Sequence, residues 1–66
     1  MAGESEVYFE ITVVGGSAKV AAVDAATTLE VAVVAPARTS VADLKKLALA
    51  KLKARIARER REGRIP

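Results

Sequence analysis

The chain has neither cysteine nor histidine among its 66 residues. The lack of cysteine excludes disulfide bonds, a common reinforcement of very small folds. Together the two absences remove the ligands of the common zinc sites and the pairs that drive Ser-His or Cys-His catalysis. We therefore predict no metal site, no cofactor and no catalytic residues.

Aromatic residues are scarce as well: there is one Phe, one Tyr and no Trp, although 52% of the residues are hydrophobic. Any core must consist of Val, Ala, Leu and Ile. A chain this short buries only about 60% of the surface that it exposes when unfolded, so it is marginally stable alone. A homo-oligomer or a protein partner is the natural expectation. A cleft of the ~300 Å³ that small-molecule sites need is hard to wall off, so we expect no enzyme and no small-molecule substrate.

No hydrophobic run reaches the length of a membrane span. The start of the chain, Met1 to Glu6, has neither the basic nor the apolar region of a signal peptide. These two absences predict a cytoplasmic protein with no membrane contact.

The charge is unevenly distributed along the chain. Residues 1–42 hold two basic and five acidic side chains, a net charge of −3, whereas residues 43–66 hold nine basic and three acidic ones, a net charge of +6. An acidic half followed by a basic half suggests an anionic partner or a head-to-tail contact.

Two segments predict a β-hairpin. Residues 6–14, EVYFEITVV, alternate between two faces with β-branched and aromatic residues, as a half-buried strand does. Gly15 and Gly16 supply the positive φ of a two-residue hairpin turn. Residues 17–24, SAKVAAVD, should then return beside the first strand.

A third strand and a helix follow. Residues 28–34 alternate again, and Pro36 should end the strand because proline cannot donate to a ladder. Ser40 is a typical N-cap, and strong helix formers fill the segment up to residue 62. Within it, Arg55–Glu59 and Arg58–Glu62 have the spacing of stabilising i, i+4 pairs.

The whole chain, residues 1–66, is thus predicted to be one small α+β domain, a three-stranded antiparallel sheet followed by one C-terminal helix. Its inward-facing side chains share the strand and helix periodicities of a single core. They are Val7, Phe9, Ile11, Val13, Val20, Leu29, Val31, Val33, Leu44, Ala48 and Leu52. On the helix, Leu44, Ala48 and Leu52 belong to a central apolar stripe that also includes Val41 and Ile56.

The opposite face of this sheet is only half polar, whereas a solvated antiparallel face normally alternates apolar and polar residues. On the helix, two leucines lie about 160° apart, so one sheet cannot bury both. These leftover apolar positions form a candidate oligomer or partner face: Tyr8, Val14, Ala21, Val23, Ala32, Val34, Leu47 and Leu49.

The basic helix has two interpretations. Its Lys and Arg side chains can lie in water with their stems over apolar neighbours. Alternatively they contact an anionic partner, most simply nucleic acid through its phosphates, without sequence readout because aromatic residues for base stacking are lacking. The candidate contact residues are Lys51, Arg55, Arg58, Arg60, Arg61 and Arg64.

The chain resembles a family of short uncharacterised alphaproteobacterial proteins. The matching residues include Val7–Glu10, Lys19–Val20, Ala22–Asp24 and Leu44–Leu49. The family usually has Asp-Pro in the second turn, Thr-Gly after it and Gly before the later proline. Ala25, Thr28 and Ala35 stand at these places here. The resemblance implies no assigned activity.

A shorter stretch, residues 39–46 (TSVADLKK), is similar to part of the head–tail joining protein W of tailed phages. That similarity favours a component of a phage-like particle. We therefore expect a non-catalytic assembly or interaction module, cytoplasmic or within such a particle. The alternative is nonspecific nucleic-acid binding through the basic helix.

Overall fold

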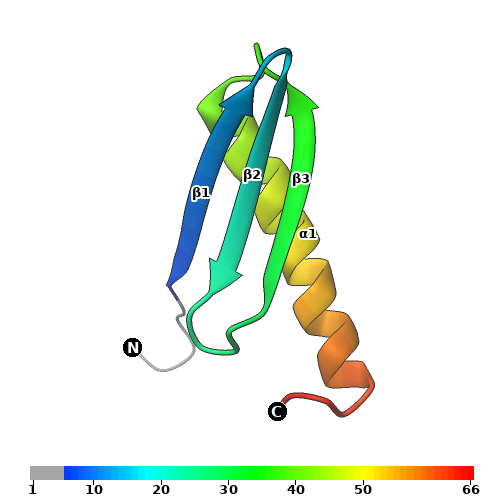
Figure 1. The fold of residues 1–66 in the computed structure, drawn as a ribbon. Helices are drawn as coiled ribbons and strands as arrows, with labels where there is room; N and C mark the ends of the chain where they lie inside the picture. The colour runs from blue at the N-terminus through cyan, green and yellow to red at the C-terminus, as the bar shows by residue number, and fades with distance from the viewer. Residues whose placement is uncertain (1–5) are drawn as a thin grey trace.

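A computed structural model shows a three-stranded sheet with one helix across one face (Figure 1). It describes residues 6–66; the chain start, on which the signal-peptide prediction depends, lies outside the described residues. The strands follow one another in the sheet, and both neighbouring pairs are antiparallel. The predicted α+β class and the β-β-β-α order are confirmed. The elements are β1 (Val7–Val14), β2 (Ser17–Asp24), β3 (Glu30–Pro36) and α1 (Val41–Arg61).

The first hairpin forms as its sequence predicts. Val14 pairs with Ser17 around the two glycines, and the register continues without a bulge to Val7 opposite Asp24. Gly15 has a φ of +58°, a conformation that glycine adopts without strain. The first strand begins at Val7, one residue later than predicted.

The turn between β2 and β3 shortens the predicted third strand at its start. The Asp24 carboxylate accepts hydrogen bonds from the backbone N–H and the hydroxyl of Thr27, at 3.0 and 2.7 Å. Thr28 follows in the left-handed region with a φ of +61°, which no strand residue can have. β3 therefore begins at Glu30 instead of residue 28.

The end of β3 also differs from the prediction. The strand runs to Pro36 rather than ending at residue 34, and Pro36 lies opposite Ser17. The proline is tolerated there because the pair of residues 17 and 36 is a non-hydrogen-bonded one, so the N–H that proline lacks would face away from β2. Its carbonyl accepts a hydrogen bond from Thr39 N–H and so starts the loop to the helix.

Helix α1 has the predicted N-cap. The Ser40 hydroxyl accepts a hydrogen bond from the Asp43 N–H at 3.1 Å, and the helix proper begins at Val41. It ends at Arg61 with Glu62 as C-cap, slightly inside the predicted range of 40–62. Gly63 has a φ of +77°, the usual left-handed residue after a helix.

The core lies between α1 and the strands β2 and β3. Each fully buried Val or Leu side chain contributes roughly 1.5–3 kcal/mol to the stability of the fold. Partly buried side chains of all three strands and Ile56 pack around this centre. The buried residues are Ala18, Val20, Ala22, Val31, Leu44, Ala48 and Leu52.

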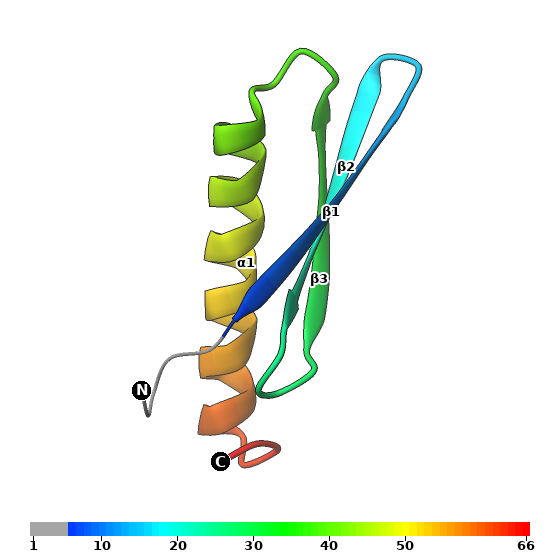
Figure 2. The same ribbon diagram turned by 90° about the vertical axis from the view of Figure 1, so that its left-hand side faces the viewer.

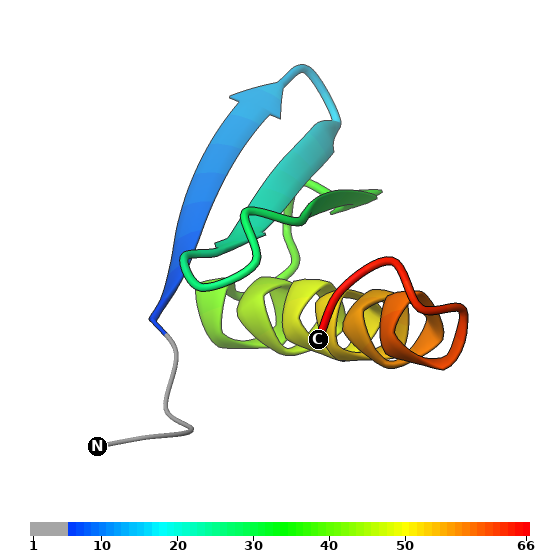
Figure 3. The same cartoon turned by 90° about the horizontal axis from the view of Figure 1, so that it is seen from below.

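Val13, which was predicted to face inward, is 58% exposed, and Val41, on the predicted apolar stripe of the helix, is 55% exposed. Both lie at the end of the molecule where the β1–β2 hairpin leans away from the first turn of α1 (Figure 2). Strand twist causes this divergence, since a straight helix cannot follow all three strands of a twisted sheet. Seen from below, α1 lies on one side of the sheet, and the far end of β1 slants away from it (Figure 3). The prediction for these two positions was wrong because it assumed a flat sheet.

Candidate functional site

The outer face of the sheet, the face opposite α1, carries the six strand residues of the candidate partner face. The register places them in rows across the strands, with Tyr8, Val23 and Glu30 in one row. Ala21 lies between Glu10 and Ala32 and is only 8% exposed, because its neighbours shield so small a side chain. The larger members are open to solvent: Tyr8 at 58%, Val14 at 73% and Val34 at 69%.

One polar contact fixes a side chain at the margin of this face. The Tyr8 hydroxyl donates a hydrogen bond of 2.6 Å to Oε1 of Glu6. This bond stabilises the protonated phenol and raises the pKa of Tyr8 above its ordinary value. The tyrosine ring is thereby held across the exposed end of the sheet.

The β3 edge of the sheet is occupied by the helix. The Lys51 ammonium donates a hydrogen bond of 2.8 Å to the carbonyl oxygen of Ala32, in the middle of β3. This bond uses an acceptor that an edge strand otherwise offers to another chain. Lys51, a predicted anion contact, thus also binds the exposed edge of the sheet.

The β1 edge has no such cover in the described part of the chain. The Ala25 N–H donates to the Glu6 carbonyl, so residues 6 and 25 form a hydrogen-bonded pair. Bonded and non-bonded pairs alternate along an antiparallel ladder. The odd-numbered residues of β1 therefore direct their backbone N–H and C=O groups away from β2. They are Val7, Phe9, Ile11 and Val13.

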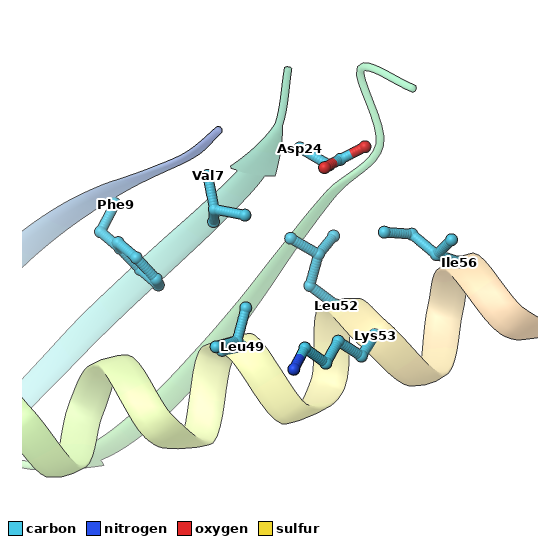
Figure 4. A pocket seen from close by; sticks show the side chains of 7 residues that line it. All are labelled: Val7, Phe9, Asp24, Leu49, Leu52, Lys53 and Ile56. Carbon is cyan, nitrogen blue, oxygen red and sulfur yellow. The ribbon is translucent and has the colours of Figure 1, made fainter. Parts of the chain in front are cut away.

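An apolar groove of about 410 Å³ lies between β1 and α1 (Figure 4). The chain was predicted to be too short to wall off a cleft of about 300 Å³; this groove is open to solvent and not walled off. Leu49, predicted as a leftover position, is half-buried on this groove, whereas Leu47 is 50% exposed on another side of the helix. The lining residues are Val7, Phe9, Asp24, Leu49, Leu52, Lys53 and Ile56.

Lys45 adds a positive charge beside the groove. Its ammonium lies 5.5 Å from the centre of the Phe9 ring, a cation–π distance. Lys53 lines the groove itself. The only carboxylate on its lining, that of Asp24, is engaged in the turn after β2. The lining of the groove is therefore mainly apolar, with Asp24 and Lys53 as its charged members.

The structure uses four of the six predicted basic contact residues internally. Lys51 binds Ala32, as described. Arg60 Nε donates to the carbonyl of Pro66 at 2.8 Å. Arg55 and Arg64 both bind Glu59, through a 3.0 Å contact from Arg55 Nε and two hydrogen bonds from Arg64.

Glu59 binds two arginines, Arg55 and Arg64, at the end of the helix, an arrangement called the clasp below. The sequence predicted the Arg55–Glu59 pair but not the Arg64–Glu59 pair. The Glu59 side chain is buried, and hydrogen bonds from Arg64 and then Arg55 lower its pKa to about 2. The pKa of Arg64 rises in turn. Arg64 also binds Glu62, so the predicted Arg58–Glu62 pair is replaced by an Arg64–Glu62 pair. Gly63, in the left-handed conformation, turns the chain back so that Arg64 reaches both glutamates. A glycine at the end of a helix was the sequence feature that indicated such a turn.

Arg58 and Arg61 are the two candidate residues whose side chains form no hydrogen bond or ion pair within residues 6–66. Both are exposed in the last turn of α1. Four of the six predicted residues thus make a hydrogen bond or ion pair within the described chain, and two make none; whether the six contact an anionic partner stays a prediction.

Within the described residues, two further features are absent. No three or more Asp or Glu side chains gather there as metal ligands could. No helix in this part of the chain has the length and hydrophobicity to span a membrane.

Comparison with known proteins identifies one family. A family model described as a domain of unknown function (DUF6898) matches residues 4–59, most of the chain. No curated protein and no solved structure matches the chain.

Proposed function

The chain belongs to the DUF6898 family, a domain of unknown function, and we propose from its geometry that it is a non-catalytic assembly module that associates with itself. Its contact surfaces are the outer face of the sheet and the β1 side. No reaction chemistry is part of this proposal.

One observation carries it: a single helix covers one face of the sheet, and the other face keeps large apolar side chains in solvent. Three of the exposed large hydrophobic residues, Tyr8, Val14 and Val34, lie on this outer face. Tyr8 lies at one end of this face and Val14 at the other, with the smaller apolar side chains Ala21, Val23 and Ala32 between them. A face with this many apolar positions is more typical of a protein contact than of a solvated sheet. A core this light also gains stability from any second layer.

The setting that we propose is the cytoplasm, or a phage-like particle assembled there. The support for the particle is the similarity of residues 39–46 to a head–tail joining protein. That segment forms the end of the loop, the Ser40 cap and the first turn of α1. Such a helix start is widespread among proteins, so the assembly function depends on the sheet and not on this similarity.

Sedimentation equilibrium of the purified chain at micromolar concentration tests the assembly function. The expected result is a mass above the 6.9 kDa of the single chain. Val14→Lys should weaken the association, because it places a charge on the apolar outer face. Ala50→Lys, which adds the same charge at an exposed helix position, is the matched control and should not. A mass of one chain at every concentration contradicts the proposal.

A second candidate function, nonspecific nucleic-acid binding, is favoured by the exposed and unpaired Arg58 and Arg61. If these two side chains contact phosphates, replacing both with alanine should reduce the slope of log affinity against log salt by about 0.9 for each contact on duplex DNA. Arg60→Ala is the comparison, since this side chain is held by the Pro66 carbonyl. Affinity that does not respond to salt, or no binding at low salt, rejects this function.

A further inference from the structure

We infer that two copies of the chain join through their β1 edges, antiparallel and with Ile11 on the two-fold axis, to form one six-stranded sheet. This inference rests on the proposed assembly function and names the surface and the pairing that carry it. It concerns the edge of the sheet, which the sequence analysis did not single out.

The two edges of the sheet differ in their protection. Natural edge strands are usually guarded by proline, by charged side chains, by a bulge or by a covering element. β3 ends in Pro36 and has Lys51 bound to its Ala32 carbonyl. β1 pairs with β2 without a bulge along its whole length and contains neither proline nor lysine; Glu10 is its one charged residue. Its free backbone groups are therefore the available ladder of this molecule.

Symmetry and register restrict how two β1 strands can pair. Only odd-numbered residues point their backbone groups outward, so a two-fold antiparallel pair must centre on one residue. A centre at Glu10 places two glutamates directly opposite, which is destabilising. A centre at Thr12 leaves only Glu10 to Val14 overlapping. The centre at Ile11 pairs Tyr8 through Val14 with Val14 through Tyr8 of the second copy.

The Ile11-centred register also brings complementary charges together. Glu10 then lies opposite Thr12 of the second copy, and Lys19 pairs with that Thr12 from β2. Glu10 and this Lys19 are two strands apart in one row, about 10 Å between Cα atoms, which their side chains can span. Within one chain the ion pairs of residues 6–66 include neither Glu10 nor Lys19. The two-fold axis makes two such pairs.

The same register covers apolar surface on both faces. On the helix side, the exposed Val13 meets Phe9 of the second copy at the groove. On the outer face, Tyr8 meets Val14, the most exposed of the large hydrophobic residues. The outer faces of the two copies become continuous, which doubles the surface assigned to the proposed function.

Disulfide trapping tests the pairing, because the chain has no cysteine of its own. Residues directly opposite in an antiparallel pair have Cα atoms about 4.5–5.5 Å apart, within the range of a disulfide. Ile11→Cys should therefore form a covalent dimer under mild oxidation. Val13→Cys is the control: it is more exposed than Ile11, but the two Val13 positions are far apart in this register. Cross-linking of Ile11→Cys should be at least about tenfold faster.

The outcomes separate this inference from the function on which it rests. Equal or faster cross-linking of Val13→Cys overturns the pairing. So does an associated wild type whose Ile11→Cys variant does not cross-link, a result that leaves the assembly function standing. A wild type that sediments as one chain ends both. If Ile11→Cys does not fold, as circular dichroism would show, the double variant Phe9→Cys with Val13→Cys serves instead, since these positions meet only between copies.

Discussion

The β1 side and the β2–β3 side of the sheet are built from similar residues but differ in how well the helix covers them. Under β2 and β3, the helix packs side chains such as Val20 and Leu52 to complete burial. Under β1, Phe9 and Ile11 are only half-buried, and Val13 is mostly exposed. The β3 edge is bound by Lys51, whereas the β1 edge is open.

In this twisted three-stranded sheet, one helix buries the inward-facing side chains of only two strands. Strand β1 keeps an open edge, a groove and exposed valines, which are more typical of an interface than of a hydrophobic core. Fold stability should therefore depend on the β2–β3 side, and association on the β1 side. The predictions below test this division, beginning with the largest effect.

Leu52→Ala should have the largest effect on stability. Leu52 is fully buried, and truncating a buried leucine costs about 2–5 kcal/mol. A chain of this length has a total stability of only about 3–10 kcal/mol, so the variant should be largely unfolded. Thermal unfolding followed by circular dichroism measures this.

Leu49→Ala is the matched change on the groove side. Leu49 is already half-exposed there, so the same truncation should cost about 1 kcal/mol. Equal losses for the two leucines would mean that the β1 side is as well packed as the other.

Acid should loosen the clasp at the end of α1. The pKa of Glu59 is lowered from an ordinary value near 4.3 to about 2 in the folded chain. A lowered folded pKa gives stability that is present above the unfolded pKa and is lost as the pH falls from about 4.3 towards 2. Urea unfolding at several pH values should show this loss in the wild type.

Glu59→Gln should lack the part of the pH dependence that Glu59 provides and should be less stable than the wild type at neutral pH. Glu62→Gln, at an exposed carboxylate of the same cluster, is the control. Identical pH profiles for wild type and Glu59→Gln would show that the buried ion pairs do not stabilise the helix end.

The two turns of the sheet offer a paired test of backbone strain. Each has a residue in the left-handed region, Gly15 in the first turn and Thr28 in the second. A side chain in this region costs about 1–2 kcal/mol. Thr28→Gly should therefore stabilise the chain by about 1 kcal/mol, measured by urea unfolding.

Gly15→Ala is the reverse change and should destabilise by about the same amount. A Cβ at Gly15 meets no atom within 4 Å, so its cost is backbone strain alone. A stabilising Gly15→Ala would show that the turn can leave the left-handed region.

The order of elements was predictable from the sequence because each depends on local signals. Alternation marked the strands, two glycines marked the hairpin, and Ser40 marked the helix start. The turn at Thr28 was missed because a threonine with positive φ has no signal in its own identity. The exposure of Val13 was missed because it depends on sheet twist.

The candidate site was less predictable for a related reason. Composition identified the basic residues, but it could not show that Lys51 reaches a carbonyl of β3 or that Arg64 folds back onto Glu59. Both contacts depend on where the helix lies and how the chain leaves it. The residues of the outer face were placed correctly because alternation alone decides which face a strand residue occupies.

The smallest expected effect on stability, and the most direct test of the two edges, is Lys51→Met. Methionine keeps an aliphatic stem but cannot donate to the Ala32 carbonyl. The loss of one exposed hydrogen bond should cost only about 0.5 kcal/mol, the low end of the usual net contribution of a hydrogen bond. The β3 edge would then be as free as the β1 edge, and a molecule with two open edges can associate at both. Sedimentation of Lys51→Met should therefore show species larger than those of the wild type.

Lys46→Met is the control: it removes an equal charge from an exposed helix position and should not produce larger species. Larger species with both variants would assign the effect to lost charge repulsion, and none with Lys51→Met would show that helix α1 guards the β3 edge without this lysine.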